Sequence, residues 1–526
     1  MKRWTIAEAA GALRRGELSV PELVESCLER IRRYDHQVEA WVMVDEAGAL
    51  QAARAAQQQL EQGQDQGPLH GIPVGIKDIF DVAGWPTKAG SPLREGHRAD
   101  QDALLVAALR RAGAILLGKT VTVEFACFDP PPTRNPWSPT LSHTPGGSSS
   151  GSAAAVAMGM CLAALGTQTG GSLIRPAAYC GIAALKPTFG QLPLEGVVPV
   201  SWRLDHAGPM ALCVEDLWLM YQVLRTAKQE VSGPQQFTVP NRPPWKQKLL
   251  FSEAAEAVQR NLFAPQQLSS SEPGLEKPCS QQSVEQGPYG EKRGLLPPLA
   301  STQADSHQTP IEELQSWYLK VLDRPPRLAQ VHGFFADQAD SIIQRLFDQA
   351  LHKLAKAGAQ IGRWDWPAEF ADVLDLHTQI MAVEAALYHR TSFLQHRNQY
   401  GPKITELLDL GLRIPAVEYL SAVDRLLCLR HQAADWLGNW DALIMPSTTT
   451  TAPANLQTTG DKTMQAPWSC AGLPVVAIPC GLGEDGMPGG VQLIGPPHQE
   501  EALLAVAGWC EKQFAFHHQP PLLQKE

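Results

Sequence analysis

The 526-residue sequence lacks the features that mark several large classes of protein. Its ten cysteines are scattered, with no CxxC pair and no zinc-ligand spacing, which favours a reducing compartment over a disulfide framework. It has no lysine–arginine cluster and a net charge of −10, so we expect no direct binding of nucleic acid. No apolar run reaches the about 20 residues that a membrane helix needs. The N-terminus MKRWTIAEAAGALRRG acquires charges too early for a signal peptide, which predicts a cytoplasmic protein that binds no membrane.

The composition is otherwise that of a globular protein, with 44% apolar and 19% charged residues, except in one segment. Residues 228–308 are rich in Gln, Pro, Ser and Gly, as in APQQLSSSEPG. Such a composition buries too little apolar surface to offset the entropy lost on ordering. We therefore predict a disordered insert over 228–308, with at most one short helix near 249–262. A folded core would be formed by residues 1–227 and 309–526.

Outside the insert, the sequence predicts alternating helices and strands. Residues 5–62 have the pattern of helices, and Ser19 with Glu22 forms a capping box before the second one. Further helices are predicted over 102–112 and 371–438, and an αβ pattern over 328–362. Short apolar runs predict strands at 114–117, 441–446 and 474–479. The fold class is therefore α/β.

The most distinctive stretch is residues 142–187, SHTPGGSSSGSAAAVAMGMCLAALGTQTGGSLIRPAAYCGIAALKP. Two glycine–serine loops, at 146–152 and 170–172, flank a run of small apolar side chains. Residues 153–165 contain no charge and no proline, which predicts a buried helix. A flexible Gly/Ser linker, the simple alternative, would not enclose such an uncharged segment. The stretch therefore predicts a site at which two serine hydroxyls come close together.

A serine nucleophile needs a proton acceptor, and residues 71–78 (GIPVGIKD) provide a candidate in Lys77. A lysine accepts a proton only when neutral, and lowering its pKa from about 10.4 to near 7 means destabilising the cation by roughly 4–5 kcal/mol. Burial at the end of an apolar strand has this effect. Asp78 would oppose it, but successive side chains of a strand point to opposite faces. The alternative is a lysine in solvent at the end of a strand.

These stretches resemble the amidase signature family, serine hydrolases with a Ser–cis-Ser–Lys triad. Further matching motifs are TKAGS at 87–91, AGLP at 471–474 and GMPGGVQLIG at 486–495. The resemblance covers about residues 5–225 and 325–515. It implies a single domain with a mixed, twisted sheet covered by helices on both faces. It also implies hydrolysis of a carboxylic amide through an acyl-enzyme, without a metal or an organic cofactor.

The family's site residues carry over to matching positions in this sequence. The resemblance implies that Ser172 is the nucleophile, Ser148 the bridging serine and Lys77 the base, with a cis peptide bond between Gly147 and Ser148. The implied oxyanion hole consists of the backbone N–H groups of Thr169, Gly170, Gly171 and Ser172. Candidate substrate-binding residues are Gly147, Ser149 and Gln168.

The sequence departs from the family pattern at three positions. One is Ser150, which stands where a glycine is usual, and the other two flank Ser172. Gln168 stands where the family usually has Asp, and Ile174 where it usually has Arg; Arg175 follows one place later. We hypothesise that Gln168 and Ile174 replace a buried acid–base pair and hold the loop by packing.

Two other motifs predict functions that we do not expect here. Residues 113–120 fit the phosphate-loop pattern GxxxxGKT, but the four intervening residues are themselves predicted to form a strand. Residues 147–151 fit the GxSxG nucleophile elbow, which requires a preceding strand and a later Asp and His. Pro145 and Gly146 leave little space for that strand, and we interpret His206 as structural.

Polar side chains at Glu384, His389, His396 and Tyr400 are candidates for the pocket rim, although most polar residues on helices are simply solvated. The chain could instead be the amide-cleaving component of a tRNA-dependent amidotransferase, or an inactive scaffold that binds partners through its insert. We expect no partner other than a small amide substrate and, at most, a second copy in a homodimer.

Overall fold

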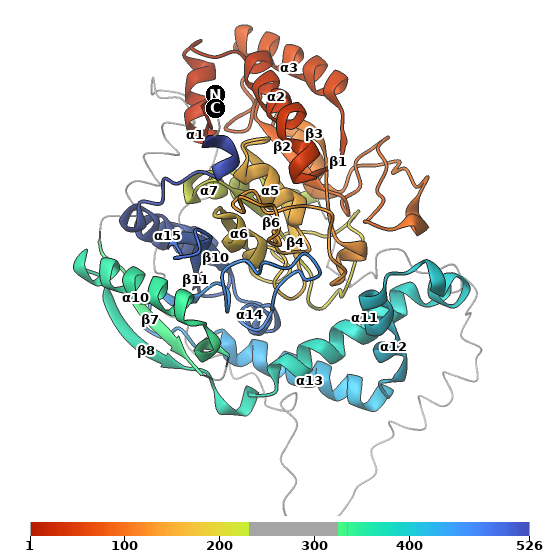
Figure 1. Ribbon diagram of the computed structural model, residues 1–526, viewed down its shortest axis with the longest axis vertical. Coiled ribbons are helices and arrows are strands. Elements are labelled where there is room, and N and C mark those ends of the chain that lie inside the picture. Colours follow the sequence, from red (N-terminus) through yellow and green to blue (C-terminus); the bar gives the residue numbers. More distant parts are fainter. Residues whose placement is uncertain (1, 231–323, 334, 525–526) are drawn as a thin grey trace, which may run out of the picture. The chain divides into compact units, whose positions relative to one another are not determined.

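The computed structural model describes residues 2–230, 324–333 and 335–524 (Figure 1). The short helix that the sequence predicts near 249–262, and nearly all of the predicted insert, lie outside these residues. No helix in the described part of the chain is long and apolar enough to cross a membrane.

The core of the fold is one mixed sheet in the order β1-β3-β2-β4-β6-β5-β10-β11-β9-β7-β8. Its eleven strands are β1 (Trp41–Val44), β2 (Pro73–Lys77), β3 (Ile115–Thr120), β4 (Ala163–Gln168), β5 (Ala183–Lys186), β6 (His206–Ala211), β7 (Arg327–His332), β8 (Gln360–Asp365), β9 (Ala442–Pro446), β10 (Val475–Leu482) and β11 (Pro488–Ile494). Strand β2 runs parallel to β3 and β4, whereas β10 runs antiparallel to β5 and β11. The predicted mixed α/β sheet is confirmed.

Helices pack on both faces of this sheet (Figure 1). Helices α5 (Ser150–Ala157) and α6 (Ile174–Cys180) contact each other and form one layer; α7 (Val214–Leu224) and α15 (Glu500–Phe514) form the other. The remaining helices are α1 (Ile6–Arg14), α2 (Val20–Val38), α3 (Glu46–Glu61), α4 (Leu104–Arg111), α10 (Ser341–Lys356), α11 (Val373–His396), α12 (Pro402–Arg413), α13 (Ala416–Ala433) and α14 (Ala466–Ala471).

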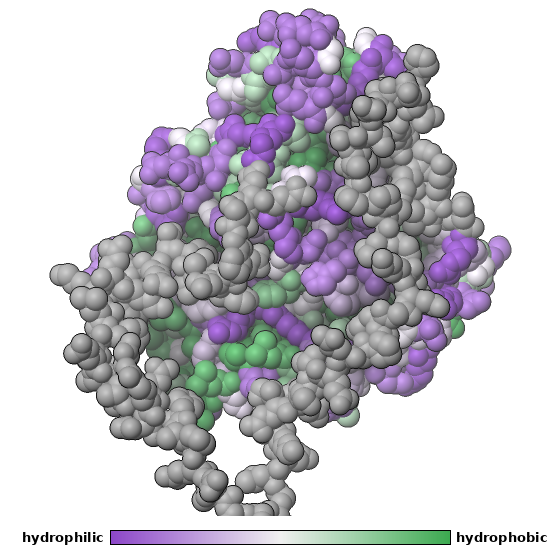
Figure 2. Space-filling model, turned by 180° about the vertical axis from the view of Figure 1, so that it is seen from behind, coloured by the Kyte–Doolittle hydropathy of each residue, from purple (hydrophilic) through white to green (hydrophobic). Residues whose placement is uncertain are grey.

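The N-terminal helices follow the predicted pattern closely. Ser19 Oγ accepts the N–H of Glu22, and the Glu22 carboxylate accepts the N–H of Ser19, so the predicted capping box is present. Helix α3 buries only a stripe of alanines and presents Gln51 and Gln58 to solvent. Figure 2 shows the resulting hydrophilic surface at the top of the molecule, where α2 and α3 lie. Strand β1, between α2 and α3, was not predicted.

The run of small apolar residues at 153–165 is not a single helix, so this prediction is wrong. Helix α5 ends at Ala157, Gly159 adopts a φ of 64° in the left-handed region, and β4 begins at Ala163. The same uncharged composition suits a buried helix and a buried strand, because both are surrounded by apolar atoms and neither shows periodicity. The turn at Gly159 makes two elements out of one run.

The register of β2 with β4 determines where the site forms. Val74 pairs with Ala163 and Ile76 with Leu165, in parallel. The carboxyl ends of the two strands therefore lie at the same edge of the sheet. Lys77 ends β2 and Gln168 ends β4, directly before the second glycine–serine loop.

Candidate active site

Three predicted side chains meet at this edge of the sheet. Lys77 Nζ lies 2.7 Å from Ser148 Oγ, and Ser148 and Ser172 line the same cavity. The peptide bond between Gly147 and Ser148 is cis, as the resemblance implies. Residues that lie 71 and 95 positions after Lys77 in the chain are thus brought to one place by the pairing of β2 with β4.

Lys77 is fully buried among hydroxyl groups. Its Nζ lies 2.7 Å from Ser148 Oγ, 3.1 Å from Ser149 Oγ and 2.7 Å from Thr167 Oγ1. Within the described residues, no carboxylate lies within ion-pair distance of Nζ. Burial lowers the pKa of Lys77 to about 7, although the more distant Asp205 and Cys127 oppose this effect. A substantial fraction of the amine is therefore neutral near pH 7.

The three hydroxyls around Lys77 are not equivalent. Ser149 Oγ donates to the carbonyl of Thr167 and accepts the N–H of the same residue. Its proton is already used, so it can only accept from Lys77. A neutral amine has two N–H donors and one lone pair. The lone pair therefore faces either Ser148 or Thr167.

The loop that carries Ser172 presents unused backbone donors to the cavity. Residues 169–173 form a turn between β4 and α6, and Thr169, Gly170, Gly171 and Ser172 all line the cavity. The N–H groups of Gly170, Gly171 and Ser172 donate to no acceptor in the described part of the chain. Ser172 Oγ likewise has no hydrogen-bond partner among the described side chains.

Side chains from distant elements hold the peptide groups of this loop. His377 Nε2 lies 3.1 Å from the Thr169 carbonyl oxygen, and Ser469 Oγ donates to the Gly170 carbonyl oxygen at 2.9 Å. Thr169 Oγ1 donates to the buried carboxylate of Asp205 at 2.6 Å. In a trans peptide the N–H points opposite to the C=O. Holding these carbonyls therefore fixes the direction of the Gly170 and Gly171 N–H groups.

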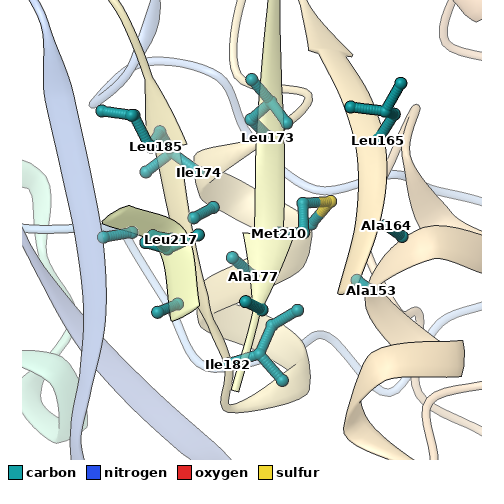
Figure 3. Close-up of a cluster of buried hydrophobic side chains, with 14 of the residues drawn as sticks. Ala153, Ala164, Leu165, Leu173, Ile174, Ala177, Ile182, Leu185, Met210 and Leu217 are labelled. Atoms are coloured by element: carbon teal, nitrogen blue, oxygen red, sulfur yellow. The ribbon is translucent and has the colours of Figure 1, made fainter. Parts of the chain in front are cut away.

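Gln168 supports the loop through the main chain. Its Oε1 accepts the N–H groups of Leu173 and Ile174, at 3.0 and 3.1 Å, and its Nε2 donates to Ser469 Oγ at 3.1 Å. The Ile174 side chain belongs to the apolar core, in which Figure 3 labels it with Leu185 and Leu217. Gln168 thus contacts Ile174 through the backbone N–H of Ile174, whereas we hypothesised that the two side chains pack together.

The predicted substrate-binding residues Gly147, Ser149 and Gln168 do not line the cavity. Each makes a buried contact instead: the Gly147 carbonyl accepts from Arg175 Nη2 at 2.7 Å, and Ser149 and Gln168 make the bonds described above. The cavity is lined by Ala126, Phe128, Ser148, Thr169, Gly170, Gly171, Ser172, Arg175, Met381, Thr459 and Lys462. Of these, Ala126, Phe128, Arg175, Met381, Thr459 and Lys462 were not predicted as site residues.

The four candidates for the pocket rim, Glu384, His389, His396 and Tyr400, lie outside the lining. Glu384 is buried and binds Ser201, Arg203 and Tyr419. The His389 Nδ1 and the Tyr400 hydroxyl lie 3.1 Å apart and bond to each other. Glu384 thus joins α11 to α13 and to the loop that contains Ser201. His389 joins α11 to Tyr400, which lies just before α12, and His396 is exposed.

The phosphate-loop pattern at 113–120 and the GxSxG pattern at 147–151 form other structures than those motifs require. Residues 115–120 of the phosphate-loop pattern form β3, and Lys119 is buried in an ion pair with Asp78 at 2.8 Å. No strand precedes Ser148 and Ser149 directly. His206 Nδ1 lies 2.7 Å from the Leu204 carbonyl oxygen at the start of β6, which agrees with its interpretation as structural. The described residues contain no group of three His, Cys, Asp or Glu side chains that could hold a metal ion.

Comparison with known proteins identifies the class. The family model described as Amidase matches residues 22–256 and 299–504. This chain therefore belongs to the amidase family, and it is a hydrolase that acts on amide C–N bonds.

Individual relatives cover almost the whole chain. An amidase of Pseudomonas putida is 30% identical over 99% of this chain and 98% of its own length. A glutamyl-tRNA(Gln) amidotransferase subunit from Chloroflexus aurantiacus is 31% identical over 99% and 98%. The structure of a peptide amidase from Stenotrophomonas maltophilia superposes with a TM-score of 0.71 at 26% identity, covering 98% of each chain.

Proposed function

We propose that this chain cleaves its amide substrate through an acyl-enzyme on Ser172, with Ser148 and Lys77 as the proton relay. The observation that carries the proposal is the Lys77 amine. It is buried, bonded to Ser148 Oγ, distant from any carboxylate of the described residues and lowered in pKa to about 7. A neutral amine in this position is a general base at physiological pH.

The proposed reaction has two stages, acylation of Ser172 and hydrolysis of the acyl-enzyme. Ser172 Oγ forms a bond to the substrate carbonyl carbon while its proton passes to Ser148 Oγ, and the Ser148 proton passes to Lys77 Nζ. The proton then returns through Ser148 to the leaving nitrogen, the C–N bond breaks and the amine departs. A water molecule attacks the resulting ester over the same relay. This releases the carboxylic acid and returns Ser172 to its hydroxyl form.

The free N–H groups of the nucleophile loop support the same proposal. As the carbonyl carbon becomes tetrahedral, its oxygen gains negative charge, which preorganised donors stabilise. The N–H groups of Gly170, Gly171 and Ser172 have no other acceptor in the described structure. We assign the oxyanion hole to these three groups together with Thr169, whose carbonyl and hydroxyl are both held in place.

Labelling with a fluorophosphonate tests the proposal, because the reagent reacts only with an activated serine. Mass spectrometry of the digested wild type should locate the label on Ser172, and Ser172→Ala should take none. Ser142→Ala, at a serine in the same stretch but outside the cavity lining, is the matched control and should label normally. Label on another residue, or none on folded wild type, would contradict the nucleophile. The latter result would also favour the scaffold alternative.

A second candidate function is supported by the full-length similarity to a glutamyl-tRNA(Gln) amidotransferase subunit, at 31% identity. In that role the chain would pass on ammonia from a glutamine side chain within a complex. Hydrolysis of simple amides by the purified chain alone would favour the independent amidase. Glutaminase activity that appears only with partner proteins would favour the amidotransferase.

We also propose a role of Gly147, Ser149 and Gln168 in substrate binding, a cytoplasmic location, a homodimer and domain boundaries at 227 and 308. Light scattering of the purified protein would decide the homodimer.

A further inference from the structure

The cavity beside Ser172 is positively charged. Arg175 and Lys462 both line it, and none of the described lining residues is acidic. The other side chains at the cavity, such as Phe128 and Met381, are apolar or small. An amide substrate would therefore meet two cations within reach of the nucleophile, and no negative charge from the protein opposes them in the lining.

Lys462 carries an ammonium whose protein partners are all neutral. Its Nζ lies 3.2 Å from His377 Nδ1 and 3.2 Å from Thr378 Oγ1, and 5.4 Å from the centre of the Phe128 ring. No carboxylate of the described residues lies within ion-pair distance of it. An ammonium has three N–H donors, so one is left for a ligand.

The protonation of His377 follows from its second partner. Its Nε2 faces the Thr169 carbonyl oxygen, which can only accept, so Nε2 carries the ring proton. Burial and the Lys462 charge hold the pKa of His377 well below its usual range, so the ring is neutral and Nδ1 accepts from Lys462. The lysine charge is therefore held in position without being neutralised.

The stem of Lys462 runs beside the nucleophile loop. A Cβ added to Gly170 would lie 3.4 Å from Lys462 Cδ and 3.4 Å from the His377 ring. The ammonium is thus held close to the loop that contains Ser172. Arg175, the second cation, donates to the Gly147 carbonyl, and its Nε has no partner in the described structure. The charge of Asp461, the residue before Lys462, opposes the effect of burial on the pKa of both cations, but this carboxylate forms no ion pair with either and does not line the cavity. Buried cations without a paired anion are unfavourable, and a bound carboxylate would supply that pair.

We propose that the substrate is an amide that carries a carboxylate, and that Lys462 binds this carboxylate beside the scissile bond. This proposal rests on the proposed function of Ser172. It adds the substrate class and a specificity-determining residue. Burial lowers the pKa of Lys462 to about 8, so most of the side chain is still charged at pH 7.

Two matched pairs of amides test the proposal. Succinamate and its methyl ester differ by a charge in the acyl part; N-acetylglycine and its methyl ester differ by a charge in the amine part. For the first pair, kcat/KM is measured from the release of ammonia. For the second pair, it is measured from the release of acetate. Cleavage of the methyl esters is measured separately. The wild type should prefer the charged member of at least one pair by about 10-fold or more, the range of a charge-assisted hydrogen bond.

Lys462→Met should then lower kcat/KM for the preferred charged amide by about 10–100-fold, mainly through KM. The neutral partner should change by less than about threefold, because it makes no charged contact. Lys353→Met, at an exposed lysine of α10, is the matched control and should change neither. An equal loss for both members would show that Lys462 only positions His377 and the loop, which would overturn the proposal.

Labelling at Ser172 and the paired-amide kinetics together distinguish a failure of the substrate class from a failure of the proposed function. Wild type that labels at Ser172 and hydrolyses neutral amides, but prefers the charged member of neither pair, would overturn the substrate class alone. Wild type that neither labels nor hydrolyses any amide would overturn both. The wild-type comparison needs no substitution, so the proposal can be refuted even if Lys462→Met does not fold.

Discussion

Two buried lysines on neighbouring strands differ sharply in their surroundings. Lys77 ends β2, and Lys119 lies on β3, where it pairs in register with Ile76. Both are fully buried, and burial lowers the pKa of both. Lys119 meets the Asp78 carboxylate at 2.8 Å, whereas Lys77 meets three hydroxyls and no acid among the described residues.

The difference shows that burial alone does not make a lysine a base. The Asp78 charge opposes the effect of burial on the pKa of Lys119, and the ion pair between the two side chains holds structure. Hydroxyl groups stabilise the cation far less than a carboxylate does, so desolvation dominates at Lys77. The two environments are separated because Lys77 and Asp78, though consecutive, point to different sides of the chain.

The largest expected effect comes from removing the amine at the active site. Lys77→Met should reduce kcat/KM by at least about 1,000-fold, because no other base of the described residues contacts the Ser148 hydroxyl. Its fold should persist, because an apolar chain of similar length replaces a buried amine. Steady-state kinetics with circular dichroism as the folding control measure this. The double variant Lys77→Met/Ser172→Ala should retain about the same kcat/KM as the less active of the two single variants. If the two losses multiply instead, the residues do not act as a unit.

The same substitution at the other lysine should affect stability instead. Lys119→Met leaves the Asp78 carboxylate buried without its partner, which should lower the free energy of unfolding by about 3–5 kcal/mol. Urea unfolding measures the loss, and Lys119→Met/Asp78→Asn should recover part of it. The activity per folded molecule should stay within about threefold of wild type, because Lys119 does not reach the cavity. A loss of activity as large as that of Lys77→Met would contradict the conclusion that Lys119 has only a structural role.

The pH dependence should report Lys77 and not Lys119. The neutral amine is the active form, so kcat/KM should fall about tenfold per unit as the pH drops below the pKa of about 7 and level off above it. The profile should be measured with an uncharged amide, so that substrate binding by Lys462 does not contribute. In Lys119→Met, kcat/KM should fall over the same pH range as in the wild type. A profile that is flat from about pH 5.5 to 8, with chemistry rate-limiting, would contradict a lysine base.

The smallest effect tests the hydroxyls themselves. Thr167→Val removes one acceptor from Lys77 without changing the shape of the side chain, so the cation loses a partner and the pKa should fall further. The limb of the pH profile should move to lower pH by about 0.5 unit, within the effect of one neutral hydrogen bond. Thr120→Val, whose hydroxyl bonds to Ser152 instead, is the control and should not move it. Equal shifts in both variants would point to a general change in packing.

The sequence was informative where a local pattern determines a local structure. The capping box at Ser19 and the apolar strand that ends at Lys77 follow from short-range rules and lie where we predicted. The second serine loop does too, whereas the first ends at Ser149, because α5 begins at Ser150. The family resemblance added the order of the motifs and the cis bond at Ser148. The pattern failed at 153–165, since a buried run without periodicity is compatible with both helix and strand.

What the sequence determined by itself is the α/β class, membership of the amidase family and the identity of Lys77, Ser148 and Ser172 as candidates. The tertiary structure alone decided what surrounds them. Lys462, His377 and Ser469 follow the nucleophile by more than 200 residues and belong to segments with no motif that marks a site. His377 on α11 and Ser469 on α14 bind the Thr169 and Gly170 carbonyls only because these two helices pack together beside the loop, and Lys462 is held there by its bond to His377. A periodic pattern records which face of an element is buried, but it carries no information about which distant residue that face will meet.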